Sequence, residues 1–243
     1  MIRNTVFALV ALFLSAPSLA DVRVKEATYS NKVSWGSEGE SKLLTSNTIW
    51  VGDNKIVFKE TKRTLILDRE KGVFVYVIPR TRTYVETPIP LDVSMIFPAE
   101  QIRKRKHQGS SGEVEPTGDS KKFLERESQE FEITSWYYDG DIRKGEREFR
   151  VWATTDVPFD VELYHDMLEI LREIHNRDEA YRAELTKMKG LQMYLELSEG
   201  NWFSGQKVIT EILEIKEMTP PEAIYEVPEG YTRKAELAEE DLQ

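Results

Sequence analysis

The sequence predicts a mainly β protein of the α+β class, in which a curved antiparallel sheet packs around one long amphipathic helix. Between residues 48 and 90, four apolar runs follow one another with only a few turn residues between them. Their β-branched and aromatic side chains favour strands, and connections this short join antiparallel neighbours. The last run, Val73–Ile78, is apolar at every position, which indicates that both faces of the sheet are covered there.

Further strands are expected on both sides of this meander. Apolar runs and alternating patterns predict strands at 21–35, 42–51, 82–86, 123–138, 147–153, 191–197 and 208–215. The segment Asp139–Asp141 should form the tip of a hairpin. The polar stretches 36–40 and 107–120 are expected to be exposed loops.

One long helix is predicted from Asp160 to Lys189. Apolar residues recur there at steps of three and four, and charged residues fill most other positions; the apolar positions are Leu163, Met167, Leu171, Ile174, Tyr181, Leu185 and Met188. Asp178 occupies the one missing place in this pattern. Asp160 is placed to cap the start of the helix, and Gly190 to cap its end. A helix with one apolar stripe needs a surface, and the curved sheet supplies it.

Both ends of the chain are expected to lie outside the folded domain. Residues 1–20 have the charged start, the short apolar core and the small-x-small end of a cleavable signal peptide, which predicts export to the periplasm. The mature domain would span 21–233, and it has no second apolar run long enough for stable membrane insertion. The acidic tail 234–243 is expected to be frayed.

The composition excludes several classes of function. The chain has no cysteine, so it carries no disulfide, no thiolate metal site and no lipidated cysteine of a bacterial lipoprotein. A formal net charge of −10 argues against nucleic acid as a partner, because phosphate backbones are bound by clustered Lys and Arg. The one basic run, Arg103–Lys106, either contacts anionic headgroups or another acidic surface, or is a solvated helix end.

No motif for catalysis or for a cofactor stands out in the sequence. Zinc-protease spacing, a nucleophile elbow, a phosphate-binding glycine loop and a dinucleotide fingerprint are all missing. Glu162, His165, Asp166 and Glu169 share one helix face, and Glu162 and His165 have the spacing of half a carboxylate-bridged di-metal site. The second half is absent, so a solvated helix face is the simpler interpretation. We predict no catalytic residue, metal or cofactor, and these four side chains are the best candidates if the protein is an enzyme.

Large apolar side chains are the more informative candidates for a binding site. They either form an ordinary core or line a slot between sheet and helix, of the kind that holds acyl chains or apolar side chains. The candidate cavity-lining residues are Trp50, Phe58, Phe74, Tyr76, Trp152, Met167 and Leu171. Trp136 and Trp202 are expected to line or rim the same sheet.

Several segments together resemble a known family. They are Trp50–Lys55, Thr64–Asp68, Tyr76–Pro79, Thr83–Glu86, Val151–Asp156 and Pro221–Tyr231. These segments look like exported bacterial proteins of unknown function whose fold is similar to that of the lipoprotein carriers LolA and LolB. The resemblance spans nearly the whole mature chain, rests on turns and apolar positions, and leaves Arg103–Ser120 as an insertion.

The resemblance implies an incomplete antiparallel barrel around a helix, with an apolar cavity that receives lipid chains in the carriers. The first hypothesis is therefore a non-enzymatic periplasmic binding protein that shelters a lipid, an acyl chain, part of a lipoprotein or an apolar peptide segment. The alternative is a structural or interaction module of the cell envelope, which would use a sheet edge or Arg103–Lys106 to bind an envelope protein. A third possibility is an enzyme on this fold.

Overall fold

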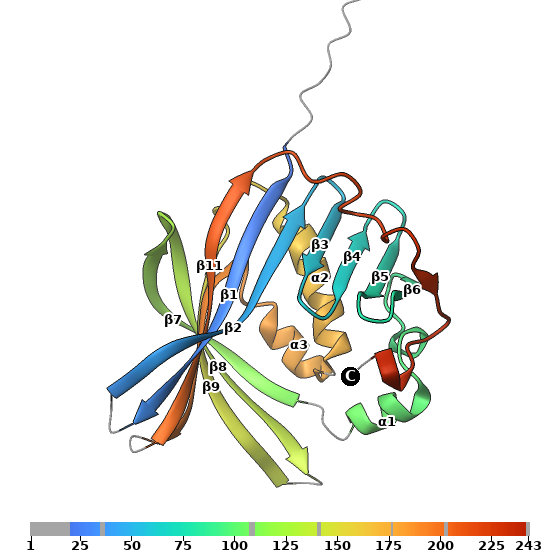
Figure 1. Ribbon diagram of the computed structural model, residues 1–243. Helices are drawn as coiled ribbons and strands as arrows, with labels where there is room; N and C mark the ends of the chain where they lie inside the picture. The colour runs from blue at the N-terminus through green and yellow to red at the C-terminus, as the bar shows by residue number, and fades with distance from the viewer. Residues whose placement is uncertain are drawn as a thin grey trace, which may run out of the picture.

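A computed structural model describes residues 20–34, 37–106, 110–139, 142–175, 177–201 and 204–241. The expected signal peptide therefore lies outside the described residues, apart from Ala20. Twelve strands form one sheet in the order β12-β6-β5-β4-β3-β2-β1-β11-β10-β9-β8-β7 (Figure 1). The strands are β1 Val22–Ser34, β2 Ser37–Val51, β3 Lys55–Lys59, β4 Thr64–Asp68, β5 Val73–Ile78, β6 Thr83–Pro88, β7 Ser110–Phe123, β8 Arg126–Asp139, β9 Ile142–Thr154, β10 Leu191–Asn201, β11 Ser204–Glu217 and β12 Thr232–Arg233.

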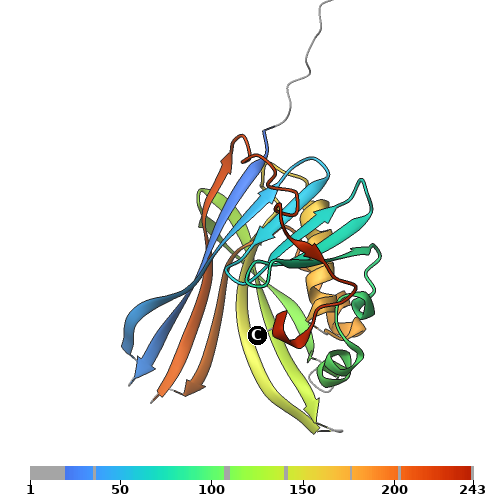
Figure 2. The same cartoon turned by 45° about the vertical axis from the view of Figure 1, so that its right-hand side comes forward.

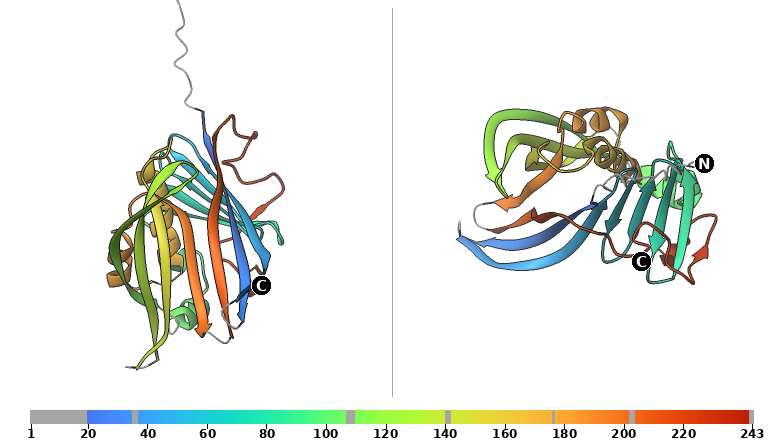
Figure 3. Two further views of the ribbon diagram at one scale, coloured as in Figure 1. Left: turned by 90° about the vertical axis from the view of Figure 1, so that its left-hand side faces the viewer. Right: turned by 90° about the horizontal axis from the view of Figure 1, so that it is seen from above.

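The helices lie on one side of this sheet, which we call the inner face (Figure 3). They are α1 Ala99–Lys106, α2 Val161–Ile174 and α3 Glu179–Leu185, together with the 3₁₀ turns η1 Val93–Met95 and η2 Glu239–Asp241. The edge strands β7 and β12 do not pair with each other, so the sheet is open and not a closed barrel. The prediction of a mainly β chain whose sheet does not close is thereby confirmed.

The predicted meander is present as β2 to β6, with each strand antiparallel to the next. Short turns fix its register, for example Val57 opposite Ile66 and Ile66 opposite Val75. Gly72 has a φ of 65°, which closes the turn between β4 and β5 in a conformation that suits glycine. The carboxylate of Asp68 accepts a hydrogen bond from the backbone N–H of Lys71 in the same turn, at 3.0 Å.

Both faces of β5 are covered, as its two-sided apolar pattern predicts. On the inner face, Phe74 and Tyr76 belong to a buried cluster that includes Met167 of α2. On the outer face, Val75 and Val77 belong to a second cluster, over which the segment 218–231 packs Ile224, Tyr225, Val227 and Tyr231 (Figure 1). Burying apolar surface on both faces makes this part of the sheet the core of the molecule.

The strands β7 to β10 form the other part of the sheet and have a core of their own. Val114, Phe131, Ile133 and Val151 pack there against three residues at the end of the helical region, Tyr181, Leu185 and Met188. Pairing of β9 with β10 ends at Phe149 opposite Leu197. Beyond that pair, the β8–β9 hairpin and the strands β10 and β11 diverge, which gives the sheet its splayed outline (Figure 2).

The single helix predicted from Asp160 to Lys189 is wrong, because the chain folds there as two helices. Asp178, the missing place in the apolar stripe, caps α3 by accepting the backbone N–H of Tyr181 at 2.7 Å. The break lets α2 pack on the meander and α3 on the β7–β9 strands. Gly190 does not end a long helix; it precedes β10 with a φ of 98°.

The loop predicted at 107–120 is also wrong, since residues 110–123 form the edge strand β7. α3 and the residues around it protect this edge. Glu184 accepts the backbone N–H of Val114 at 3.0 Å, and the N–H of Asp178 donates to the carbonyl of Ser110 at 3.1 Å. The expected loop 36–40 is shorter than predicted, because β2 begins at Ser37. Residues 107–109, 140 and 141 lie outside the described residues.

Candidate functional site

A groove of about 700 Å³ lies on the inner face, beside the meander. Three parts of the chain position its walls: strand β2, the β3–β4 turn with the end of β5, and the docked C-terminal turn η2. The lining residues are Leu44, Thr45, Asn47, Glu60, Thr61, Lys62, Arg63, Tyr76, Ile78, Arg80 and Asp241. This volume lies within the range of about 300–1,000 Å³ that is usual for small-molecule sites.

The apolar wall of the groove is formed by Leu44, Tyr76 and Ile78. Tyr76 and Ile78 point to the inner face of β5 and are nearly buried, with 6% and 4% of their surface exposed. Leu44 is 48% exposed. It is an extra residue in β2, because pairing with β1 shifts from Thr28–Thr45 to Tyr29–Leu43. Such a bulge redirects a side chain, and here it leaves an exposed leucine beside the groove.

A partly buried arginine, Arg63, anchors the polar wall. The guanidinium of Arg63 donates to both carboxylate oxygens of Glu60, at 2.8 and 3.0 Å, and to the hydroxyl of Tyr76 at 3.3 Å. Burial alone would lower the pKa of Arg63, but Glu60 and Tyr76 outweigh burial and raise it. Arg63 therefore stays charged, and the pair fixes the β3–β4 turn against the groove.

A second polar pair, Glu26 and Asn47, lies at the β1–β2 wall. The side-chain amide of Asn47 donates to Oε1 of Glu26 at 2.9 Å. Burial raises the pKa of Glu26, the hydrogen bond from Asn47 opposes that shift, and repulsion by Glu60 adds to it. Burial thus disfavours the charged form of the Glu26 carboxyl.

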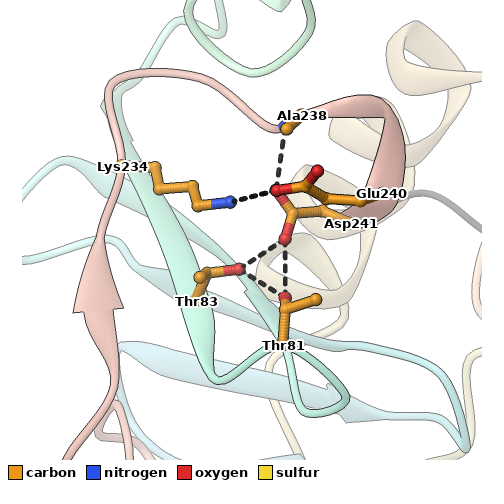
Figure 4. A network of polar contacts seen from close by, with 6 residues as sticks. All are labelled: Thr81, Thr83, Lys234, Ala238, Glu240 and Asp241. Carbon is orange, nitrogen blue, oxygen red and sulfur yellow. Dashed lines mark hydrogen bonds and ion pairs between the residues drawn. The ribbon is translucent and has the colours of Figure 1, made fainter.

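The C-terminal turn closes the groove on the remaining side. Asp241 accepts hydrogen bonds from the hydroxyls of Thr81 and Thr83, at 2.6 and 3.0 Å, and from Nζ of Lys234 at 2.7 Å (Figure 4). The backbone N–H of Ala238 adds a fourth, at 2.8 Å. Burial would raise the pKa of Asp241, but these partners outweigh it and lower the pKa to about 2. The tail predicted to be frayed is therefore docked as far as Asp241.

The predicted cavity-lining residues do not form one wall. Tyr76 lines the groove. Phe74 and Met167 are fully buried in the core between sheet and α2, and Phe58 and Leu171 pack partly buried against that core.

Trp50 and Trp152 lie on the outer face. Trp50 is buried under the C-terminal segment, in the cluster with Val57 and Val75. The ring of Trp152 lies 5.9 Å from that of Phe123 and 5.3 Å from that of Tyr194. Trp202 lies outside the described residues. The prediction that both Trp50 and Trp152 line an inner cavity is therefore wrong, because alternation along a strand sends them to the opposite face.

The groove residues other than Tyr76 were not predicted, although the sequence contains two weak signals. Leu43 and Leu44 interrupt the alternation of β2, which is typical of a bulge. Glu60 and Arg63 lie three residues apart across a short turn, and this spacing allows an ion pair. Neither signal alone points to a groove.

Three of the four candidate residues of an enzyme site serve separate structural roles, and the side chain of the fourth, Glu162, is exposed. Nε2 of His165 accepts the backbone N–H of Gly190 at 3.0 Å, and Asp166 forms an ion pair with Arg69 at 2.8 Å. Glu169 pairs with Arg172 at 2.8 Å. Within the described ranges, no group of three or more His, Cys, Asp or Glu side chains is arranged to hold a metal ion.

The basic run Arg103–Lys106 forms the end of α1. Arg103 is exposed, and the side chains of 104–106 lie outside those described. Across the part of the chain that the structure covers, no helix is long and apolar enough to cross a membrane.

Comparison with protein-family models and with curated proteins finds no match. Among solved structures, a structure of PNGF-II is similar with a TM-score of 0.40 and 11% sequence identity, over 90% of this chain. The chain spans 32% of the length of that protein. A TM-score and an identity this low carry no argument about fold or function.

Proposed function

We propose that this protein is a non-enzymatic periplasmic binding protein that holds the acyl chain of a lipid or lipoprotein in the groove on its inner face. The observation that carries the proposal is the groove itself, about 700 Å³ in volume and lined by Leu44, Tyr76 and Ile78. Sites that bind small molecules are typically concave and apolar, with a few fixed polar groups, and the Arg63–Glu60 pair supplies such groups here.

Two further features support a binding role. Leu44 exposes about half of its surface beside the groove, where burial under an acyl chain would contribute favourable free energy. The resemblance of the sequence to proteins with a fold similar to LolA and LolB points to the same class of ligand. Export of the chain and its place in the periplasm belong to this proposal and rest on the pattern of residues 1–20.

The proposal is tested by adding a twelve-carbon fatty acid, laurate, to the mature domain, with thermal unfolding and displacement of an apolar dye as readouts. A ligand that binds only the folded state raises the melting temperature by mass action. We expect laurate to displace the dye and raise the melting temperature, and Leu44→Glu to weaken both effects.

Leu213→Glu is the matched control, because Leu213 is 45% exposed but is not part of the groove. Equal losses in the two variants, or no dye displacement by the wild type, would contradict the proposal. The second outcome would favour the interaction module of the cell envelope, which predicts binding to an envelope protein and no response to laurate.

A further inference from the structure

The charges around the groove favour one class of amphiphile. We propose that the groove selects a single-chain amphiphile with an anionic headgroup, a carboxylate or a phosphate, which Lys62 and Arg80 bind at the rim. This inference rests on the proposed function and adds the headgroup chemistry to it.

The two acidic side chains of the lining are already engaged. Glu60 is bound by Arg63 through both carboxylate oxygens. Asp241 has Lys234 and two threonine hydroxyls as partners. The positive charges of Arg63 and Lys234 therefore offset the attraction of these carboxylates for a cationic headgroup.

Lys62 and Arg80 are exposed, and within the described residues neither has a hydrogen bond or ion pair. They emerge at the same end of the sheet, because Thr64 of β4 pairs with Val77 of β5. Lys62 lies two residues before Thr64, in the β3–β4 turn, and Arg80 lies three residues after Val77, in the β5–β6 turn. An anion between these two turns would meet two cations at once, in a protein whose formal net charge is −10.

Two more groups add to the preference for an anion. A guanidinium has five N–H donors, and Arg63 uses three of them on Glu60 and Tyr76, so two are left for a headgroup oxygen. Glu26, the acceptor of the Asn47 amide in the wall, has a pKa raised by burial, which disfavours the charged form of its carboxyl. With the headgroup at Lys62 and Arg80, the chain would extend over Leu44, Tyr76 and Ile78.

The test compares five amphiphiles that share a twelve-carbon chain: laurate, dodecyl phosphate, dodecyl sulfate, dodecylphosphocholine and dodecyltrimethylammonium, each below its micelle concentration. Dye displacement measures the affinity of each one for the mature domain. We expect the three anions to bind roughly tenfold or more tightly than the cation, and added salt to reduce that difference. A preference for laurate over dodecyl phosphate would identify a fatty acid as the source of the headgroup, and the reverse would identify a phospholipid.

Lys62→Glu combined with Arg80→Glu should weaken anion binding by roughly tenfold and leave the zwitterion almost unchanged. The control combines Lys122→Glu with Lys189→Glu, which changes the net charge equally at exposed positions outside the groove. Equal affinity for anions and cations, or equal losses in both double variants, would overturn this inference and leave the proposed function intact. Failure of all five amphiphiles to bind would instead overturn the proposed function.

Discussion

At the scale of single residues, Asp241 shows how a polar network can fix a chain end. Its side chain has no exposed surface, and it has four hydrogen-bond partners (Figure 4). Its pKa lies at about 2, below the ordinary value of 3.8. A carboxyl whose pKa is lowered by folding stabilises the folded state above its ordinary pKa, and this contribution is lost as the pH falls through the folded value.

Asp241→Asn tests that contribution. The difference between 3.8 and about 2 corresponds to about 2 kcal/mol of stabilisation at neutral pH. We expect the substitution to open the tail, and the N–H of Leu237, which donates to the carbonyl of Ile96, to exchange roughly tenfold or more faster at pH 7. In the wild type, protection of this amide should decline as the pH falls from about 4 towards 2. Unchanged exchange in the variant would show that the network does not hold the tail.

Gly190 and Asp241 show why the structural role of a single residue cannot always be predicted from the sequence. Gly190 was correctly singled out as a position for glycine, but for the wrong reason. A Cβ atom there would lie 2.0 Å from the carbonyl oxygen of Thr154, so the backbone of β9 excludes any side chain. Asp241 carries no signal at all, because its partners Thr81 and Thr83 are about 160 residues away in the sequence. Contacts over such distances depend on the completed fold.

At the scale of elements, the break between α2 and α3 separates two packing surfaces. The sequence contains the cause, since Asp178 interrupts the apolar stripe and suits a helix start. An apolar stripe that keeps its 3.6-residue period on both sides of Asp178 nevertheless predicts one helix, because periodicity does not report that the two halves face different strands. The strand β7 was missed for a related reason. Most of its side chains from Glu115 to Lys122 are exposed and polar, so nothing in the pattern distinguishes an edge strand from a loop.

A pair of alanine substitutions in α2 tests how the helix packs. Met167 is fully buried between the helix and the meander, whereas Leu171, one turn later, is only partly buried. We expect Met167→Ala to lower the free energy of unfolding by about 3 kcal/mol and Leu171→Ala by about 1–2 kcal/mol, as measured by urea denaturation. Comparable losses would show that Leu171 belongs to the tightly packed core. A smaller loss at Met167 than at Leu171 would contradict the packing described for α2.

At the scale of the whole molecule, the sequence predicted the antiparallel meander and its two covered faces. Local sequence patterns are sufficient for these predictions. Short turns force antiparallel pairing, and a strand that is apolar on both faces must be packed against other residues on both faces. The groove could not be predicted in the same way. It arises where β2, two turns of the meander and the C-terminal turn meet, and only Tyr76 among its residues was predicted to line a cavity.

The most direct test of the central claim is to locate a bound chain. A laurate analogue with a photoreactive diazirine on its alkyl chain would be bound to the mature domain, irradiated and mapped by peptide mass spectrometry. We predict labelling at Leu44 and at residues 76–80, competed away by unmodified laurate and reduced in Leu44→Glu but not in Leu213→Glu. Labelling confined to the ring cluster of Phe123, Trp152 and Tyr194, or scattered labelling that laurate does not compete away, would contradict binding in the groove.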